Sequence, residues 1–170
     1  MTLFQIGEKI VYPNHGIGTV ENISTRSFGA QAERFYLLRL TYTSTTVMVP
    51  FSHVTEIGLR KVTRNGEVAR VFGYLAEETS KRKCDWKDRF KENSDRMRKG
   101  TLLEIAEVLK TLLMLQIEKP LSFREKKMLD RARHMLITEL SISRGLGESE
   151  AVELIEKALA KAQLALPAAL

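Results

Sequence analysis

The only tryptophan of the chain, Trp86, lies within its most basic segment. Residues 81–99 contain nine Lys or Arg and four Asp or Glu, which gives a net charge of +5 over nineteen residues. A large flat ring surrounded by cations can insert an apolar wedge at a base step while the cations neutralise the neighbouring phosphates. These residue types are therefore compatible with a contact to nucleic acid.

A helix from Asp85 onward would turn by about 100° per residue and would place Trp86, Phe90 and Met97 on one face. Cations would flank that face on both sides, and Asp88 would lie with other acidic residues on the back. The same spacing is typical of the buried stripe of an amphipathic helix. The pattern alone leaves two interpretations open, an exposed binding face and an ordinary core stripe.

Few side chains favour catalysis, which needs a convergent set of polar groups. We interpret His15 and His53 as turn residues and His134 as a partly exposed helix residue. Cys84 follows three cations that would favour its thiolate, but no histidine lies near it in sequence. The Gly16-Ile17-Gly18 segment joins two predicted strands, whereas a phosphate-binding loop joins a strand to a helix. We predict no enzyme, no cofactor and no metal site.

The formal charge of +6 is unevenly distributed. Residues 1–63 carry +2, residues 64–144 carry +6, and residues 145–170 carry −2. A polyanionic partner is therefore expected to bind the middle of the chain. One cysteine, no apolar run of membrane-spanning length and no signal-like N-terminus favour a cytoplasmic protein.

The first sixty residues read as short strands rich in Val, Ile, Tyr, Phe and Thr, divided by turn signals. Such strands predict a small, strongly bent sheet or barrel, which residues 58–62 could complete. Arg26 and Arg39 are isolated cations here; Arg26 is either a solvated turn residue or a contact for an acidic partner. An open sheet edge could also pair with a partner strand. The predicted strands are 9–13, 17–24, 34–41 and 45–50.

After Gly58 the apolar period becomes helical. Thr101 with Glu104, and Ser122 with Glu125, form two predicted capping boxes. In the helix that Ser122 opens, a basic stripe faces outward, made of Arg124, Lys127 and Arg131. The predicted helices are 67–78, one from residue 85 onward, 101–116, 122–142 and 150–164. We expect a β module at 1–63, a helical domain at 64–144 and a helical extension at 145–170.

The order of these features is similar to that of a known family. The chain resembles the CarD/CdnL family of bacterial transcription regulators over residues 3–142. The motifs that carry the resemblance are FxxGExIVYPxHGIGxV (4–20), MVP (48–50), GLR (58–60), DWxxRFKxNxxRM (85–97), EIAEVLKxL (104–112) and LSFREKKMLDRARxMLIxEL (121–140).

The resemblance implies an α+β fold, with a Tudor-like N-terminal β module of about five strands and a helical C-terminal domain. The module of this family docks on the β subunit of RNA polymerase. Its helical domain binds promoter DNA at the upstream edge of the transcription bubble, where a tryptophan acts as a minor-groove wedge. On this resemblance, Trp86 is the wedge.

Other positions take their implied roles from the same resemblance. Arg89, Phe90 and Lys91 match the basic segment that follows the family's tryptophan, and Lys126 matches a lysine implicated in DNA contact. Arg26 matches an arginine that contacts the polymerase. Met48 stands where some members have a second such arginine, which implies a more apolar interface here. Likewise, Asp88 replaces a basic residue of some members, which implies one phosphate contact fewer.

We therefore expect a non-enzymatic transcription activator that binds RNA polymerase holoenzyme and stabilises the open promoter complex. Its DNA contact would be largely independent of sequence, since phosphate contacts and a wedge carry little base information. It would reside in the bacterial cytoplasm, on the nucleoid through the polymerase. The first alternative is a protein-interaction adaptor of the transcription machinery without DNA contact. A thiol-dependent enzyme that uses Cys84 is the second.

Overall fold

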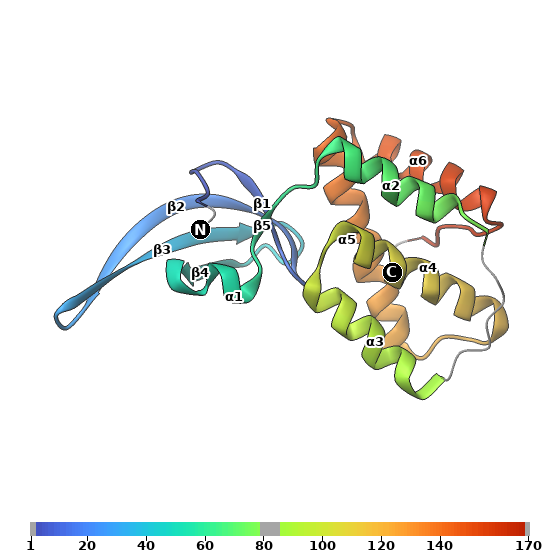
Figure 1. Ribbon diagram of the computed structural model, residues 1–170, viewed down its shortest axis with the longest axis horizontal. Helices are drawn as coiled ribbons and strands as arrows, with labels where there is room; N and C mark the ends of the chain where they lie inside the picture. The colour runs from blue at the N-terminus through green and yellow to red at the C-terminus, as the bar shows by residue number, and fades with distance from the viewer. Residues whose placement is uncertain (1–2, 79–85, 169–170) are drawn as a thin grey trace. The chain divides into compact units, whose positions relative to one another are not determined.

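The computed structural model in Figure 1 describes residues 3–78 and 86–168; of residues 28 and 86–89 it describes only the backbone. The chain divides into two compact units, Met1–Val62 and Thr63–Leu170. The first unit contains the strands and the second contains α2 to α6. The α+β class expected from the sequence is confirmed.

The first unit, which we call the β unit, is built on a five-stranded antiparallel sheet with the order β4-β3-β2-β1-β5. The sheet is open, because β4 and β5 form its two edges. Figure 1 shows that β2 and β3 are long and curved. The strands are β1 (Lys9–Tyr12), β2 (Gly16–Phe28), β3 (Gln31–Leu40), β4 (Thr46–Pro50) and β5 (Arg60–Lys61).

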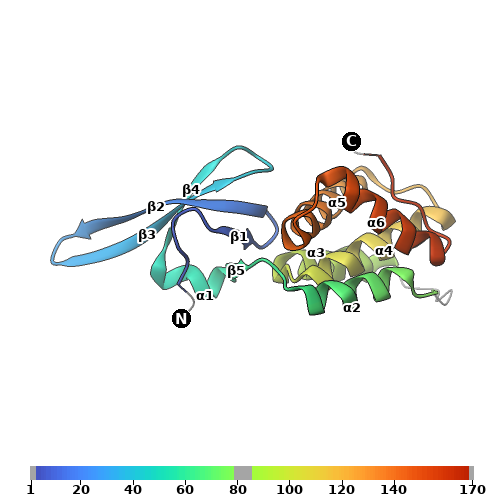
Figure 2. The same cartoon turned by 90° about the horizontal axis from the view of Figure 1, so that it is seen from above.

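Strands β2 and β3 are longer than the sequence pattern predicts. Residues 25–28 pair with residues 31–34 beyond the reach of the other strands, and they form a two-stranded arm (Figure 2). This arm lacks the alternation of apolar residues that marks a half-buried strand, so the pattern missed it. Its turn contains Gly29, whose φ of 63° suits glycine better than residues with a side chain.

The β core is centred on Tyr36. Its ring stacks on Phe51 with the centroids 4.2 Å apart, and its hydroxyl accepts a hydrogen bond of 3.0 Å from the backbone N–H of Phe4. Phe51 lies in a short helical segment that the sequence did not predict, formed by η1 (Phe51–His53) and α1 (Val54–Ile57). The buried cluster consists of Phe4, Ile10, Val20, Tyr36, Leu38, Val49, Val54 and Leu59.

The second unit, which we call the helical unit, packs its helices around α4. Nine residues of α4 are buried, including Leu109 and Leu112. Helix α6 packs against α2 and α5 and contributes Ala151 and Ile155 to the same core. None of the helices in the described residues is long and apolar enough to cross a membrane. The helices are α2 (Asn65–Ala76), α3 (Trp86–Lys99), α4 (Leu102–Glu118), α5 (Phe123–Arg144) and α6 (Glu148–Lys161).

The two predicted capping boxes differ in the structure. Ser122 and Glu125 form the complete reciprocal pair at the start of α5. At the start of α4, the Thr101 hydroxyl accepts from the N–H of Glu104, but it donates to the Glu104 carboxylate at 2.9 Å. The carboxylate therefore binds the capping hydroxyl, whereas in a full box it would bind the backbone N–H of Thr101.

Thr63 marks the start of the helical unit through its hydrogen bonds. Its backbone N–H and its hydroxyl both donate to Oε2 of Glu139 on α5, at 2.9 and 2.6 Å. Its carbonyl accepts a hydrogen bond from the Ser143 hydroxyl. The first two bonds satisfy Oε2 of the buried Glu139 carboxylate, and all three bonds attach Thr63 to α5.

Candidate functional site

Helix α3 begins at Trp86, one residue after the start that the sequence predicts. The side chains of Trp86, Asp88 and Arg89 lie outside the described residues, as does Cys84. The wedge role of Trp86 and the phosphate contact of Arg89 therefore remain predictions. The described part of the site consists of the remainder of α3 and the helices that hold it.

The predicted apolar face of α3 is not uniform. Met97, near the end of the helix, is 2% exposed and belongs to the core of the helical unit, which fits the core-stripe interpretation. Phe90, two turns earlier, is only half-buried, and Lys91 beside it is exposed. The C-terminal part of α3 is thus anchored in the core, while the part that follows Trp86 carries exposed charge.

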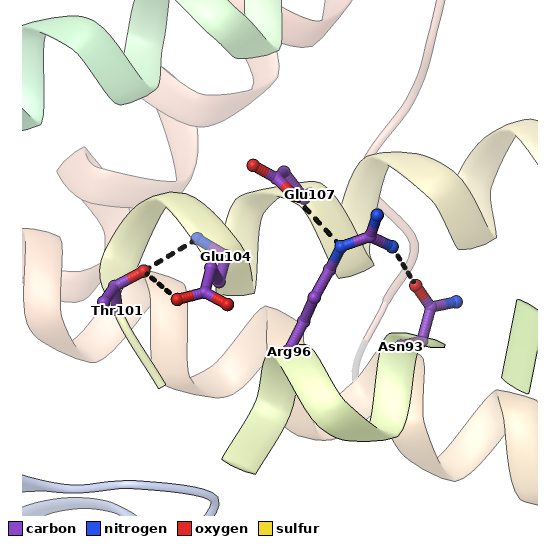
Figure 3. Close-up of polar contacts among 5 residues, drawn as sticks. All are labelled: Asn93, Arg96, Thr101, Glu104 and Glu107. Carbon is purple, nitrogen blue, oxygen red and sulfur yellow. Dashed lines mark hydrogen bonds and ion pairs between the residues drawn. The ribbon is translucent and has the colours of Figure 1, made fainter. Parts of the chain in front are cut away.

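A polar clamp attaches α3 to α4. The Nε atom of Arg96 lies 3.0 Å from Oε2 of Glu107 on α4, and Nη1 of Arg96 donates to Oδ1 of Asn93 at 3.1 Å (Figure 3). Asn93 is fully buried. Helical spacing alone would place Arg96 among the cations that flank the Trp86 face, but its guanidinium holds α3 against α4.

The cations of α3 therefore fall into two groups. Arg98 pairs with Asp95 on its own helix, and Arg96 pairs across to α4. Lys91 and Lys99 are exposed and make no ion pair or hydrogen bond with another described side chain. Of these two, Lys91 is the residue to which the family resemblance assigns a DNA contact, and an exposed ammonium group suits a phosphate.

The first turn of α5 lies against α3. The guanidinium carbon of Arg124 is 4.1 Å from the centroid of the Phe90 ring, a cation–π contact. The starts of both helices lie at the lower edge of the helical unit in Figure 1. The sequence placed Arg124 in an outward basic stripe, but nothing in its spacing could identify Phe90 as the partner.

Lys126 and Lys127 follow on the same helix, and both are exposed. At about 100° per residue, Lys126 lies about 160° around α5 from Arg124. The cations of this turn therefore lie on two sides of the helix, and Arg124 is the one that meets α3. The Nζ atom of Lys127 lies 4.6 Å from the centroid of the Phe123 ring.

Cross-strand register places Arg26 and Met48 on one face of the sheet. Arg26 is opposite Glu33, and Met48 is opposite Leu37. Residues directly opposite each other share a face, and faces alternate along a strand. Since Glu33 and Leu37 are separated by four residues on β3, both pairs lie on the same face. Tyr36 lies on the other face, which covers the β core.

This outer face combines a cation with apolar surface. Met48 is 38% exposed and Leu37 is half-buried. Glu33 accepts a hydrogen bond from the hydroxyl of Ser52, and no ion pair engages Arg26 within the described residues. Residues 35–38 are all apolar, so alternation could not assign Leu37 to a face, and the register was needed to place it beside Met48 and on the face of Arg26.

The structure gives Arg39, His15 and His134 ordinary contacts within the fold. Arg39 lies 3.7 Å from the Glu21 carboxylate. His15 packs edge-on against Tyr12 in its turn, and burial lowers the pKa of the half-buried His134. In the described part of the chain, His, Cys, Asp and Glu side chains form no group that could hold a metal ion.

Comparison with known proteins matches each unit to a separate domain of one family. The family model described as CarD-like/TRCF RID domain matches residues 4–63, and the model described as CarD, C-terminal domain matches residues 70–156. Over 148 residues the chain is 36% identical to the Bacillus subtilis (strain 168) protein named "Putative transcription factor YdeB", covering 87% of this chain and 97% of that protein. Both domains are matched in order, and the chain therefore belongs to the CarD family of transcription factors.

Proposed function

We propose that this protein is a non-enzymatic activator that binds the β subunit of RNA polymerase through its β unit and promoter DNA through its helical unit. It stabilises the open promoter complex at the upstream edge of the transcription bubble, with Trp86 as a minor-groove wedge. The observation that carries this proposal is the match of the two units, in order, to the CarD-like/TRCF RID domain and the CarD C-terminal domain. Its site of action is the bacterial cytoplasm, on the nucleoid through the polymerase.

The outer face of the sheet supplies the polymerase contact. Arg26 offers an unpaired guanidinium among the described side chains, and Met48 and Leu37 offer apolar area next to it. An interface with few charges gains most of its stability from buried apolar surface. The edge strand β4, which bears Met48, also has backbone groups on its open side that could pair with a partner strand.

The N-terminal part of α3 and the first turn of α5 supply the DNA contact. Lys91 and Lys126 are exposed cations, and Arg89 belongs to the same helix as Lys91. Each cation that neutralises a phosphate releases counterions, so such a surface binds DNA with little dependence on sequence and with strong dependence on salt.

The anchoring of α3 supports the wedge role of Trp86. Met97 and the ion pair from Arg96 to Glu107 hold the C-terminal part of the helix against the core. A helix fixed at one end holds the residues at its other end at a defined position, because its backbone hydrogen bonds keep it stiff. The wedge can then transmit force to a base step without loss of its position.

Replacing Trp86 by alanine tests this function. Trp86→Ala leaves the β unit intact, so recruitment to polymerase should persist while the open complex becomes shorter-lived. A stacked or wedged aromatic ring contributes about 1–3 kcal/mol, which corresponds to about a fivefold to 150-fold change in open-complex stability. Dissociation of the open complex, measured after addition of a DNA competitor, reports this lifetime.

Two measurements separate the wedge from a structural role. Trp86→Phe should recover part of the lifetime, because it keeps an aromatic ring. A core tryptophan, in contrast, would cost about 3–5 kcal/mol on truncation and lower the melting temperature markedly. Strong thermal destabilisation with normal promoter opening per folded molecule would contradict the wedge.

The adaptor alternative predicts a different result with DNA alone. An adaptor would show no duplex binding at any salt concentration, whereas the proposed activator shows binding that weakens steeply as salt rises. Cys84→Ser should leave all activity intact, which would exclude the thiol-dependent enzyme. For the division of the chain, we propose residues 1–63 as the polymerase module, 64–144 as the DNA-binding domain and 145–170 as a packing extension.

A further inference from the structure

We propose that Phe123 is a second aromatic contact to nucleic acid, separate from Trp86. This inference rests on the proposed DNA-binding function of the helical unit. Phe123 is the first residue of α5 and is 70% exposed, which makes it the most exposed aromatic residue in the described part of the chain. An aromatic ring left in water forgoes the stabilisation of burial, and this ring lies among cations that could hold a polyanion against it.

The surroundings of Phe123 are cationic. Lys127, one turn later, places its ammonium group 4.6 Å from the ring centroid. Arg124 and Lys126 lie on either side of the ring in the same turn, and both are exposed. The acidic residue of this turn, Glu125, has its carboxylate bound to the backbone N–H of Ser122 in the capping box. Among the described residues, the charged groups around Phe123 that make no ion pair are therefore positively charged.

The contact between Arg124 and Phe90 joins this turn to α3. The guanidinium carbon of Arg124 lies 4.1 Å from the ring centroid of Phe90, so the surface around Phe123 lies beside the helix that starts with Trp86. Phe90 and Phe123 therefore belong to one cationic surface, which is composed of residues from α3 and α5.

The cations and the exposed ring together favour a partner that carries both negative charges and flat apolar groups. An acidic protein surface would satisfy the cations, but it would offer nothing that favours a flat ring among them. Nucleic acid offers phosphates for the cations and bases or sugars for the ring. Because Lys127 covers part of Phe123, the remaining ring surface is left for a base or a deoxyribose.

The ring could contact either opened promoter DNA, in which bases are unpaired, or closed duplex, in which they are paired. In opened DNA, an unpaired base can stack on the phenyl group. In closed duplex, the ring can pack only against the sugars and base edges of a groove. The shared chemistry is a flat apolar surface bordered by phosphates, and the two sources are distinguished by the DNA used in the test.

The test compares Phe123→Ala with Ile117→Ala in the full-length chain. Ile117 is 71% exposed at the end of α4, so its removal controls for the loss of an exposed apolar side chain. Binding is measured by fluorescence anisotropy with a paired duplex and with the same duplex carrying an unpaired segment. We expect Phe123→Ala to weaken binding by about fivefold or more, as loss of a stacked ring does, while Ile117→Ala binds like wild type.

The salt dependence sharpens the result. Phenylalanine releases no counterions, so Phe123→Ala should lower affinity without a change in the slope of log affinity against log salt. Phe123→Trp should retain affinity. Phe123→Leu keeps apolar bulk without a ring and should bind like Phe123→Ala. A loss confined to the DNA with the unpaired segment identifies a stacked base, and an equal loss on both identifies a groove contact.

The outcomes distinguish failure of this inference from failure of the proposed function. Wild-type DNA binding with no difference between Phe123→Ala and Ile117→Ala overturns the role of Phe123 alone. The same holds if Phe123→Ala weakens polymerase binding and leaves DNA binding intact. Absence of salt-dependent DNA binding by the wild-type chain overturns both. Because Phe123 is largely exposed, its variants should keep the wild-type melting temperature.

Discussion

The β unit and the helical unit assemble their exposed surfaces in different ways. In the β unit, register along a continuous backbone ladder places Arg26 and Met48 on one face. In the helical unit, the surface is composed of residues from two helices that meet through Arg124 and Phe90. The sheet surface is thus determined by local pairing, whereas the helical surface depends on how the core packs.

The two segments of the chain also differ in net charge. Residues 1–63 carry a net charge of +2, and residues 64–144 carry +6. A surface with few charges suits a protein partner, and a strongly cationic surface suits a polyanion. Under the proposed function, the apolar outer face of the sheet serves a protein partner, and the cationic helices serve DNA.

Substitutions in the two cores should have the largest effect on stability, and they test whether the β unit and the helical unit unfold separately. Leu109→Ala, in the core of the helical unit, should cost about 2–5 kcal/mol, and Tyr36→Ala, in the β core, about 3–5 kcal/mol. Each should lower the thermal transition of its own unit. Leu109→Ala should keep polymerase binding and lose DNA binding, and Tyr36→Ala should do the reverse. A single shared transition that both substitutions lower equally would contradict the division.

Reversing the charge of Arg26 should affect only the polymerase contact. Arg26→Glu should weaken binding to core polymerase by about 1–3 kcal/mol, because an ion pair is lost and a repulsion is gained. DNA binding should remain at the wild-type level. A pull-down of core polymerase with residues 1–63 and with the full chain measures the effect.

Arg39 provides the matched control for this substitution. It lies on the same face as Arg26, but it is already paired with Glu21, so Arg39→Glu should have the smaller effect. Met48→Arg, which introduces the second cation of some family members, should strengthen binding. If Arg26→Glu binds like wild type, or if residues 64–170 alone bind polymerase as well as the full chain, the outer face of the sheet is not the contact.

The salt dependence of binding should differ between the two surfaces, and it can be tested with substitutions that leave the fold intact. Binding of DNA should weaken steeply with salt, and binding of polymerase should weaken only slightly. Alanine at Arg89, Lys91 and Lys126 should each reduce the DNA slope by about one. Arg98→Ala is the control, because Arg98 is paired with Asp95. An unchanged slope in the triple variant would mean that these cations are only solvated.

The smallest expected effect is a pH dependence confined to the helical unit. Burial lowers the pKa of His134 below its usual 6.5, although Glu148 and Asp130 oppose the shift and Arg133 adds to it. The unfolded chain therefore binds more protons below pH 6.5 than the folded chain does. Stability should fall as the pH drops from about 6.5 toward the lower folded pKa.

Thermal unfolding of the wild type and of His134→Gln at pH 7 and at lower pH measures this dependence. The variant should lose the part of the acid sensitivity that His134 contributes, and the transition of the β unit should not respond to the substitution. An identical pH profile in the variant would mean that other groups cause the dependence.

Most helices and strands, and the family, could be predicted from the sequence alone. The spacing of apolar residues, the turn residues and the helix caps depend on residues within about four positions of each other. Helices and strands can therefore be predicted from the local sequence. These features predicted the start of α3 to within one residue and the capping box at Ser122, and the motifs identified the two family domains. The arm formed by residues 25–34 escaped the pattern, because its strands have no buried face to record.

The tertiary structure was needed to distinguish residues of similar type and spacing by their burial and their contacts. Met97 and Phe90 fit one stripe by spacing, but Met97 is buried and Phe90 is half-buried. Arg96 and Lys91 are equivalent cations by sequence, but Arg96 alone reaches Glu107. These outcomes depend on distances between helices, and the same local pattern is compatible with many such distances. Local free energies specify the elements, and packing of the shared core selects the neighbours of each side chain.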